Sequence, residues 1–393
     1  MRTQWESVVS DDYNAELQQA WDEFCDRIKA AGRLAFRSET PDAPLTRATG
    51  VRYMARYIAK ALDHELNFAD PLYPQFWHLQ SPTNKSFGDN PDCTYLDAVV
   101  DGAHDYRIVG DRGTVAWVSF KAGGNVLHHH QLKTEWDGAF VVELSQTEKP
   151  GNWLKLDPGR QRVFLRQFFG EWDRERPMRV RIERVGADAP PPPLTPGEVI
   201  EGLRNAAEWM TTDSAYWPRW VDSFLETPNR FVAGVPKFVG NDGNSALLNR
   251  SLSFCGWRIQ PDEALVIDVV PPACAYWNYE LGDRWWNSVD YRYRLSSLNG
   301  HQAEAEPDGR VWAVVSHRDP GVWNWLDTGG NVEGSVNHRW VEAADTTPLP
   351  NARLVRFDAL DQVLPPTVRR ITAEERREQL RRRKIGVDQR FAV

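Results

Sequence analysis

Residues 137–154 read DGAFVVELSQTEKPGNWL, and residues 308–326 read DGRVWAVVSHRDPGVWNWL. Each stretch has Asp-Gly, an apolar run that ends at a serine (Ser145 and Ser316), Pro-Gly and then Asn-Trp-Leu. Asp-Gly between two strand-like runs is typical of a tight hairpin turn, so we expect turns rather than catalytic aspartates there. Several landmarks in one order at nearly one spacing predict an internal duplication.

A second similarity lies upstream of each copy. PDCTY (91–95) matches PACAY (272–276), so that Cys93 and Cys274 occupy equal places in the two stretches. We therefore expect these two segments to be equivalent strands. Because pockets form preferentially where two units meet, the duplication also predicts a site at or near the junction of the halves.

The chain alternates between helical and strand-like texture. Short apolar runs and Gly- or Pro-containing turns recur from about residue 75 to 185 and again from about 230 to 360, each time after helical segments. The predicted fold is mainly β with appended helices (α+β), built from two related β-sandwich or jelly-roll-like halves. The expected divisions are an N-terminal helical segment (1–70), a first β-rich half (71–189), a proline linker with helices (190–228), a second β-rich half (229–365) and a basic tail (366–393).

Apolar residues at helical spacing predict two helices in the first part, at 12–31 and 49–66. In the second of these, Val51, Met54 and Ile58 are expected on the buried face. In the second part we expect helices at about 197–210 and 214–226.

Two of the helix starts carry a capping box. Thr195 followed by Pro196 and then Glu198 is one, and Thr372 with Glu375 is the other, at the start of an arginine-rich helix. Because glutamates are interleaved with its arginines, we expect that last helix to be a solvated face or a subunit contact.

Composition excludes several classes of function. The 393 residues include 47 basic and 55 acidic side chains, for a net charge of −8, whereas a general nucleic-acid binder needs a basic face. No apolar run of about 18 residues predicts a membrane span, and the first 13 residues lack the apolar stretch of a signal peptide. Four scattered cysteines without C-x-x-C spacing predict a reduced, cytoplasmic protein without structural zinc.

Cofactor and nucleophile motifs are not found in the sequence. It contains no G-x-S-x-G, phosphate-binding loop or dinucleotide-binding glycine pattern. In a strand, His128 and His130 share a face with His129 opposite, so at most two converge, and a metal site needs three or four ligands. We therefore expect no metal and no other cofactor, with a metalloenzyme that uses His128 and His130 as an alternative.

The densest candidate for chemistry is YWNYELGDRWWNSVDYRYR (276–294). If residues 289–295 form a strand, Tyr291 and Tyr293 share one face. A phenol can stabilise a developing oxyanion or act as a general acid, so Tyr276, Tyr291 and Tyr293 are the predicted acids or oxyanion donors. The alternative is a core stripe of aromatic side chains beside a solvated Asp/Arg ladder.

The second candidate is Asn324-Trp325-Leu326-Asp327, whose counterpart in the first half begins at Asn152. Repetition favours a structural role, because an asparagine can close a loop on backbone groups. Only the second copy continues with Asp327, so we expect the active site in the C-terminal half, with His317 or His338 as the base. The predicted ligand-binding residues are Trp277, Trp285 and Trp325 as walls and Asn278, Arg294, Asn324 and Asp327 as orienting polar groups.

These segments resemble a known family. DYRYRLSSLNG with PDGRVWAVVSHRDPGVWNWLDTGG is similar to the bacterial domain of unknown function 1214, and GDNPDCTYLDAVVDG with GNWLKLDPGRQRVFLRQFF is similar to its partner, domain of unknown function 1254. The resemblance covers roughly residues 85–350. It implies a jelly-roll-like β-sandwich with appended helices, in soluble bacterial proteins often encoded near catabolic genes for hydrophobic compounds.

The leading hypothesis is a cofactor-independent enzyme, lyase- or hydrolase-like, that applies acid/base chemistry to a hydrophobic aromatic or polycyclic small molecule in a catabolic pathway. One alternative is a non-catalytic binding or carrier protein for such ligands. Another is a carbohydrate-active or carbohydrate-binding protein, because tryptophan and tyrosine stack on sugars, and it predicts an open cleft. Exposed sheet edges and a charged terminal helix are compatible with a homodimer.

Overall fold

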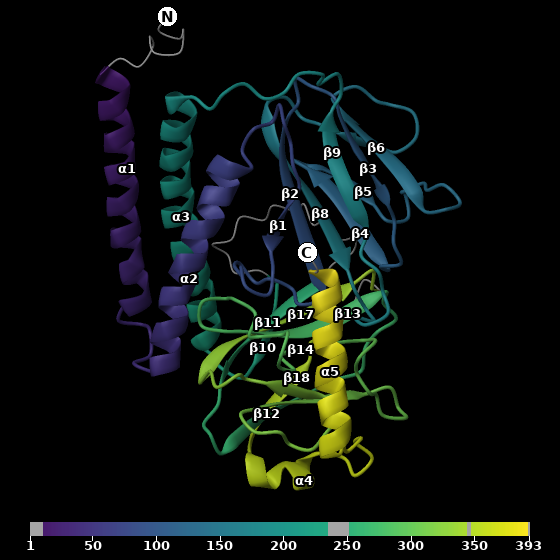
Figure 1. The fold of residues 1–393 in the computed structure, drawn as a ribbon. Helices are drawn as coiled ribbons and strands as arrows, with labels where there is room; N and C mark the ends of the chain where they lie inside the picture. The colour runs from purple at the N-terminus through teal and green to yellow at the C-terminus, as the bar shows by residue number, and fades with distance from the viewer. Residues whose placement is uncertain (1–10, 235–250, 344–346, 392–393) are drawn as a thin grey trace, which may run out of the picture.

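The computed structural model describes residues 11–234, 251–343 and 347–391 (Figure 1). The first part comprises α1 (Asp11–Ala31), η1 (Gly32–Phe36), α2 (Pro44–Leu62), η2 (Asp63–Asn67), β1 (Trp77–Gln80), β2 (Cys93–Asp101), β3 (Tyr106–Asp111), β4 (Trp117–Ala122), β5 (Asn125–His128), β6 (Ala139–Ser145), β7 (Trp153–Lys155), β8 (Arg160–Phe168) and β9 (Arg179–Arg184). The second comprises α3 (Pro196–Leu225), β10 (Phe231–Ala233), β11 (Ser251–Arg258), β12 (Glu263–Val269), β13 (Tyr276–Gly282), β14 (Ser297–Asn299), β15 (Val311–Ser316), β16 (Trp325–Asp327), β17 (Glu333–Val341), β18 (Asn351–Arg356), η3 (Phe357–Ala359), α4 (Leu360–Val363) and α5 (Ala373–Arg390).

The two halves have the same strand order. The first half has a five-stranded sheet β1-β2-β8-β4-β5 and a four-stranded sheet β7-β6-β3-β9. The second half has β10-β11-β17-β13-β14 and β16-β15-β12-β18, which is the same connectivity strand for strand. The short parallel pairs β6–β7 and β15–β16 also correspond. The predicted mainly β fold, with two related halves and appended helices, is therefore confirmed.

Topology confirms one of the two sequence matches and corrects the other. The Asp-Gly to Asn-Trp-Leu stretches form β6–β7 and β15–β16, which are equivalent, and Gly138 and Gly309 take the left-handed conformation of their turns. Cys93, however, begins β2, whereas Cys274 precedes β13, the counterpart of β4. The PDCTY/PACAY match is thus wrong, because a short motif fits any strand with the same alternation.

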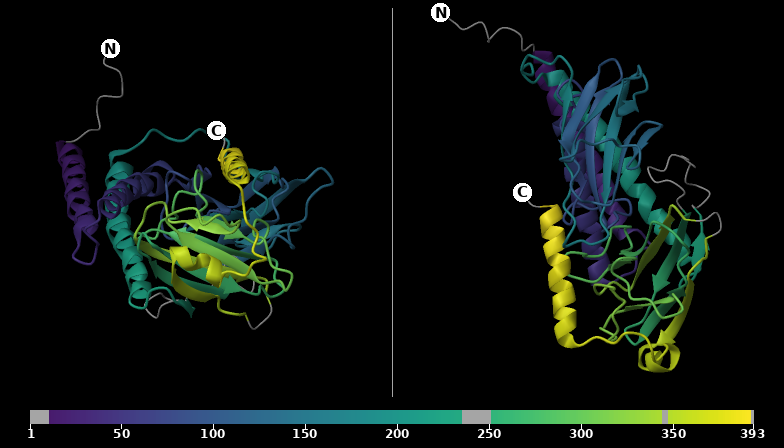
Figure 2. Two further views of the ribbon diagram at one scale, coloured as in Figure 1. Left: turned by 90° about the horizontal axis from the view of Figure 1, so that it is seen from below. Right: turned by 90° about the vertical axis from the view of Figure 1, so that its right-hand side faces the viewer.

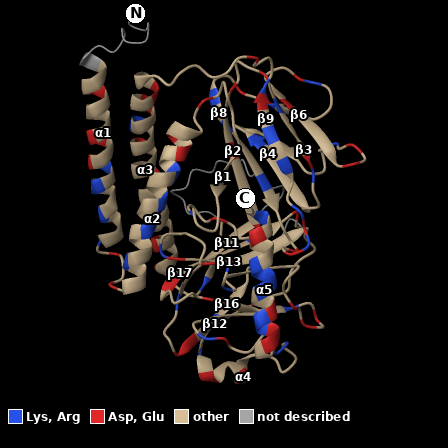
Figure 3. Ribbon diagram, viewed as in Figure 1, with Lys and Arg blue, Asp and Glu red and all other residues tan. Residues whose placement is uncertain are grey.

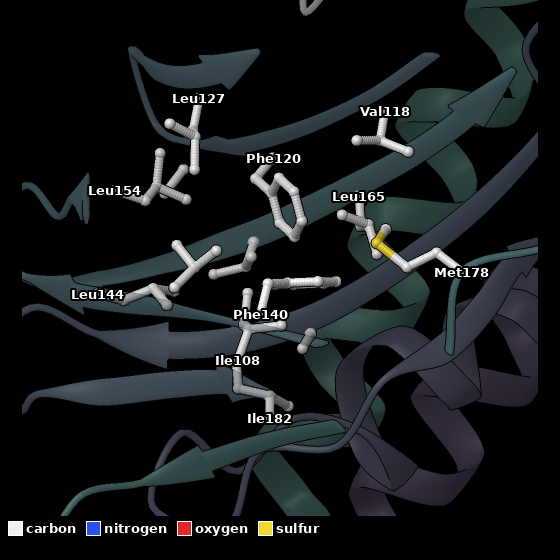
Figure 4. Close-up of a cluster of buried hydrophobic side chains, with 14 of the residues drawn as sticks. Ile108, Val118, Phe120, Leu127, Phe140, Leu144, Leu154, Leu165, Met178 and Ile182 are labelled. Carbon is white, nitrogen blue, oxygen red and sulfur yellow. The ribbon is translucent and has the colours of Figure 1, made fainter. Parts of the chain in front are cut away.

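Each half has its own hydrophobic core between its two sheets. In the first half, Leu165 of β8 and Phe120 of β4 point inward against Phe140 and Ile108 of the smaller sheet (Figure 4). The rings of Phe120 and Phe140 meet edge to face at 5.9 Å, an arrangement that aromatic pairs prefer.

The other faces of the two five-stranded sheets meet at the junction of the halves. Cys93, Tyr95 and Phe168 from the first half pack with Tyr276 and Val341 from the second in one buried cluster. Helices α1, α2 and α3 lie together along one side of the molecule, and α5 lies along another (Figures 1 and 2). The outer sheet faces, which face solvent in many antiparallel folds, are therefore interior surfaces here.

Helix α3 is one continuous element and not the two expected helices. It spans 30 residues, about 45 Å at 1.5 Å per residue, and packs on α1, α2 and η2 as well as on β11 and β17. Pro218 lies inside it. The predicted capping box is present, with Thr195 Oγ1 accepting from the backbone N–H of Glu198.

The buried face of α2 agrees with the prediction at Met54, which is buried, and differs from it at Val51. Val51 is exposed, whereas Gly50, Tyr53 and Tyr57 face the core. The reason is Trp285, whose ring packs so closely on the helix that a Cβ at Gly50 would lie 2.4 Å from it. A loop from the second half, which periodicity does not show, thus decides the helix face.

The expected strand at 289–295 is a turn. Asp290 Oδ1 accepts the backbone N–H groups of Arg292 (2.9 Å) and Tyr293 (3.2 Å), which closes an aspartate-led turn. Tyr291 is buried while Tyr293 is 56% exposed, so the two tyrosines do not share a face.

Helix α5 joins the two halves through arginines spaced by seven residues, about two helical turns. Arg376 binds Asp319 through two hydrogen bonds (2.8 and 3.0 Å), and Arg383 donates to the Tyr291 carbonyl (2.8 Å), both in the second half. Arg390 donates to the carbonyl of Pro91 in the first half (2.8 Å). Figure 3 shows the dense charges of this helix. This buried arginine stripe is therefore an internal docking surface, which the sequence did not predict. Arg377, Arg381 and Arg382 are exposed and form the expected solvated face.

None of the helices in the described ranges is both long and apolar enough to cross a membrane. Residues 1–10, on which most of the signal-peptide prediction rests, lie outside the described residues.

Candidate functional site

A cavity of about 1030 Å³ lies at the junction, between the outer faces of the two five-stranded sheets and helix α3. Its lining comes from both halves: Glu65, Gln80, Phe87, Gly88, Asp89, Tyr95, Arg160, Phe164, Arg166, Phe168, Asn205, Glu208, Trp209, Thr212, Asp213, Tyr216, Trp217, Trp220, Leu252, Phe254, Trp286 and Arg339. Ten of these 22 residues are aromatic. Arg160, Glu208 and Thr212 form an exposed rim, so the cavity opens to solvent. The duplication predicts a pocket at or near the junction, and the cavity lies there; that it is a functional site stays a prediction.

One wall of the cavity is a tryptophan cluster. The ring of Trp286 lies 4.8 Å from that of Trp217 and 4.9 Å from that of Trp220, measured between centroids. Trp286 and Phe87 both have positive φ angles (55° and 37°), and a Cβ at Gly88 would lie 2.6 Å from the Trp286 ring. Non-glycine residues in this region are uncommon and cluster at functional sites.

Asp213 of α3 is the carboxylate best placed for proton transfer. Its Oδ2 accepts hydrogen bonds from Tyr57 Oη (2.7 Å) and Trp217 Nε1 (3.0 Å). Its Oδ1 has no hydrogen-bond donor among the described residues, and the residue lines the cavity. Burial raises the pKa of this carboxyl above its ordinary value, against the two hydrogen bonds. A fixed carboxylate with one free oxygen and a raised pKa suits a general base.

A second group of buried charges borders the cavity through Asp89 and Gln80, which line it. Asp89 accepts from the Ser288 backbone N–H (2.9 Å) and hydroxyl (2.6 Å), and Lys85 Nζ donates to the Ser288 hydroxyl (2.8 Å). Lys60 is fully buried and donates to Gln80 Oε1 (2.9 Å) and to the Ser86 hydroxyl. Burial lowers the pKa of Lys60 to about 7 and that of Lys85 to about 8.

Two equivalent arginines project into the cavity, one from each half. Arg166 in β8 and Arg339 in β17 each stand two residues before the end of the central strand of their sheet. Arg339 donates to Glu280 at 2.8 Å, and burial raises the pKa of Glu280 to about 7 against the charge of Arg339. The guanidinium of Arg166 lies over the ring of Phe164 (4.7 Å to the centroid).

Beside the cavity, the junction is closed by a polar network around Asp92, whose side chain is fully buried. Asp92 Oδ1 accepts from Trp172 Nε1 (2.7 Å) and Asn299 Nδ2 (2.8 Å), and Oδ2 accepts from Tyr276 Oη (2.6 Å) and Asn278 Nδ2 (3.1 Å). Burial raises the pKa of the Tyr276 phenol well above its ordinary range. Two of the predicted site residues, Tyr276 and Asn278, thus lie in this network, which joins the halves.

The cavity lining contains none of the twelve site residues predicted from the sequence. Tyr291 packs under Arg383 and beside Trp172, with Lys85 Nζ 4.3 Å from its ring centroid. Trp285 lies in the helical core, where its Nε1 donates to the Thr46 carbonyl (3.1 Å). The cavity residue is its neighbour Trp286, because the turn at 284–286 sends the two rings in different directions.

The predicted histidine bases are also placed elsewhere. His338 lies on the face of β17 opposite Arg339, buried among aromatic rings with Nδ1 3.0 Å from the Ser253 hydroxyl. Burial lowers its pKa to about 3. His317 Nδ1 lies 2.8 Å from the Thr328 hydroxyl, at the far sheet of the second half. Trp277 packs in the core of the second half.

The repeated asparagines do the same work in both halves. Asn152 Nδ2 donates to the carbonyls of Lys133 (2.8 Å) and Val141 (2.9 Å), and its Oδ1 accepts the N–H of Lys133 (2.7 Å). Asn324 makes the equivalent bonds to Glu304 (2.7 Å to the carbonyl, 2.9 Å from the N–H) and to the Trp312 carbonyl (2.9 Å). The motif closes a loop, as the structural interpretation of the repeat expects.

The remaining predicted binding residues lie near the loop that Asn324 closes in the second half. Arg294 pairs with Asp327 at 2.9 Å. Trp325 Nε1 is 3.4 Å from the Ser316 carbonyl, and Trp153 Nε1 makes the matching bond to Ser145 (3.2 Å). Trp325 also lines a second cavity beneath α5, of about 900 Å³. The structure therefore spreads the predicted site over several places.

Among the described residues, no group of three histidine, cysteine, aspartate or glutamate side chains is arranged to hold a metal ion. His128 ends β5, and His129 and His130 lie in the following turn, where the rings of His128 and His130 stack at 5.8 Å. His129 lies 3.9 Å from Glu342 of the other half.

Comparison with solved structures gives a relative that is similar over nearly its whole length. An uncharacterized protein from Burkholderia cenocepacia is 36% identical, with a TM-score of 0.82 over 88% of this chain and 99% of the other. This chain belongs to the same family as that protein. A protein from Vibrio parahaemolyticus is 12% identical over 84% of this chain and 100% of its own, with a TM-score of 0.47.

No family model and no curated protein matches the chain. The resemblance to the domains of unknown function 1214 and 1254 accordingly stays a prediction.

Proposed function

We propose that this protein is a cofactor-independent enzyme, lyase- or hydrolase-like, that acts on a hydrophobic aromatic small molecule in the cavity between its halves. The observation that carries the proposal is the combination in one cavity of ten aromatic side chains and Asp213, a carboxylate with one oxygen held and the other free. Aromatic rings bind the body of such a ligand by stacking. The free oxygen accepts a proton from it.

The arrangement of Asp213 supports the role of base over that of a purely structural carboxylate. Both protein donors approach Oδ2, so that a ligand proton meets Oδ1 without displacing either of them. The raised pKa brings the carboxyl closer to neutral pH, where proton transfer by a general base is most efficient. We expect the acid limb of the rate profile to lie above the ordinary aspartate pKa.

The test begins with the ligand. Mass spectrometry of the purified protein under gentle and then denaturing conditions identifies a retained aromatic compound, whose turnover is then measured. Asp213→Asn keeps the acceptor for Tyr57 and Trp217 and removes the base, so kcat should fall about 100-fold or more while binding persists. Glu208→Gln is the matched control, since Glu208 is an exposed carboxylate on the cavity rim of the same helix. Unchanged kcat in Asp213→Asn would refute the acid/base assignment.

A second candidate is a non-catalytic binding or carrier protein. Asp89, the buried aspartate of the lining, has both carboxylate oxygens occupied by Ser288, which favours a structural charge at that position. Tight binding of the retained compound without chemical change would support the carrier. The carbohydrate alternative predicts that the retained compound is a sugar.

A further inference from the structure

Arg166 differs from the other cavity arginines in its surroundings. Among the described residues it has no hydrogen bond and no ion pair. Its buried Nε lacks a partner, as does the Nε of Arg339, so the missing ion pair is what distinguishes it. Its described contacts of note are the rings of Phe164 (4.7 Å) and Tyr95 (5.8 Å), both in the cavity wall. Arg166 is half-buried, and its two terminal nitrogens are not among the buried atoms, so they are open to the cavity. They are therefore available to an anion that enters it.

Arg339, the equivalent arginine of the second half, has a carboxylate partner. Arg339 has Glu280 at 2.8 Å, and Arg160 at the rim has Glu65 at 3.7 Å. In the described part of the chain, Arg166 is thus the cavity arginine without a carboxylate. The duplication has kept the cation in both halves but supplied a counter-charge in one.

The charges of the cavity that remain available to a ligand lie on different walls. The arginines come from the sheets, and Arg166 is the one without a carboxylate among the described residues, whereas Asp213, with its free Oδ1, comes from α3. The other three acidic lining residues already have partners: Glu65 of η2 pairs with Arg160, Glu208 of α3 pairs with Arg27, and Asp89 is bonded to Ser288. A ligand with an acidic group is attracted to the sheet wall and repelled from the helix wall. Its body then spans the aromatic rings between them and reaches Asp213.

From these contacts we infer that the ligand is an aromatic compound with a carboxylate or similar planar anion, which Arg166 binds through its fork of N–H donors. Guanidinium groups match carboxylates in a bidentate geometry that neutral amides do not reproduce. The inference rests on the proposed function, because it names the class of molecule that enters the same cavity.

The test is isothermal titration calorimetry with matched acid and amide pairs of increasing size: benzoate and benzamide, 2-naphthoate and 2-naphthamide, and phenanthrene-9-carboxylate and its amide. The wild-type protein should bind at least one acid about tenfold or more tighter than its amide, as expected for a charge-assisted hydrogen bond. Arg166→Gln should abolish this preference and leave the affinity for the amide unchanged. Arg166→Lys should retain part of it.

Arg181→Gln is the matched control, since Arg181 is an exposed arginine of the same half, lies outside the cavity lining and already has Glu183 as a partner at 3.7 Å. It should keep the preference for the acid. Thermal unfolding of each variant shows that the fold is intact, and the unchanged amide affinity of Arg166→Gln is a second check.

The outcomes separate the two proposals. Equal affinity for acid and amide in the wild type, or an undiminished preference in Arg166→Gln, would overturn the carboxylate inference and leave an aromatic cavity. Failure of every acid and every amide to bind at millimolar concentration would count against the proposed function itself, and the inference would fall with it.

Discussion

The two halves meet in two neighbouring regions, and these differ in whether their polar groups have hydrogen-bond partners. Around Asp92, four side-chain donors converge on one carboxylate and both of its oxygens are occupied. In the cavity, Arg166 and one oxygen of Asp213 have no such partners in the described part of the chain. Satisfied groups rigidify a junction, and unsatisfied ones carry a cost that a ligand can remove. The contrast separates the part of the junction that holds the halves together from the part that binds.

The largest effect is expected at the satisfied region. Asp92→Ala leaves Trp172 Nε1 and Tyr276 Oη without their acceptor and removes one of the acceptors of Asn278 and Asn299. It should lower the free energy of unfolding by about 4 kcal/mol. Asp92→Asn keeps one acceptor oxygen and should cost less. Urea unfolding measures both. A loss below about 1 kcal/mol in Asp92→Ala would show that the network does not hold the junction.

Asn152 and Asn324, the asparagines that close equivalent loops, should give the next largest loss of stability when they are replaced. The loss should be equal in the two halves. Asn152→Ala and Asn324→Ala each leave three backbone groups unpaired, so we expect about 3 kcal/mol of destabilisation for each. Asn→Asp at either position keeps the acceptor but removes the two donated bonds, and should fall between wild type and Ala. Markedly different losses would mean that the two loops have equivalent hydrogen bonds but contribute unequally to stability.

Gly88→Ala examines the strained segment of the cavity wall. A methyl group there strains the left-handed backbone and contacts the Trp286 ring, so we expect about 2–3 kcal/mol of destabilisation. Gly151→Ala is the matched control, because Gly151 also has positive φ but nothing lies within 4 Å of its Cβ position, and about 1 kcal/mol is expected. The difference isolates the ring contact. Equal losses would show that Trp286 moves aside freely.

The smallest effect concerns pH. Burial lowers the pKa of Lys60 to about 7 from 10.5, so between these values the unfolded chain binds more protons and stability rises with pH. The rise from pH 7 to pH 8 should be about 1 kcal/mol larger in the wild type than in Lys60→Met. Chemical denaturation at the two pH values tests this, and identical slopes would mean that Lys60 stays charged in the folded protein.

The framework of the fold could be predicted from the sequence because its signals are local. The Asp-Gly turn, the apolar strand and the corner asparagine are contiguous in each half, and both capping boxes act within four residues. The wrong match of Cys93 with Cys274 shows that such local signals do not identify equivalent strands. Strand equivalence depends on sheet order, which a five-residue motif does not encode.

The cavity could not be predicted, for physical reasons that particular residues illustrate. RQRVFLRQFF is correctly predicted to be a strand from its alternation of apolar and polar residues. Arg166 and Phe164, however, lie on the face that would be solvated in an isolated sheet. This face becomes buried only because the five-stranded sheet of the second half and α3 cover it. From the sequence we expect two helices, at about 197–210 and 214–226, with Asp213 between them. Trp209 and Trp217 on either side, eight residues apart, carry the aromatic signal of one cavity-lining helix face.

The three indoles at the cavity have a consequence for spectroscopy. Trp286 lies within van der Waals reach of Trp217 and Trp220, with the planes of Trp220 and Trp286 only 17° from parallel. Transition dipoles at such separations couple, so this cluster should give an exciton couplet in the circular dichroism spectrum. Because all three rings line the cavity, a bound aromatic molecule would enter the same coupled array. The protein therefore carries a built-in optical reporter of the occupancy of its own cavity.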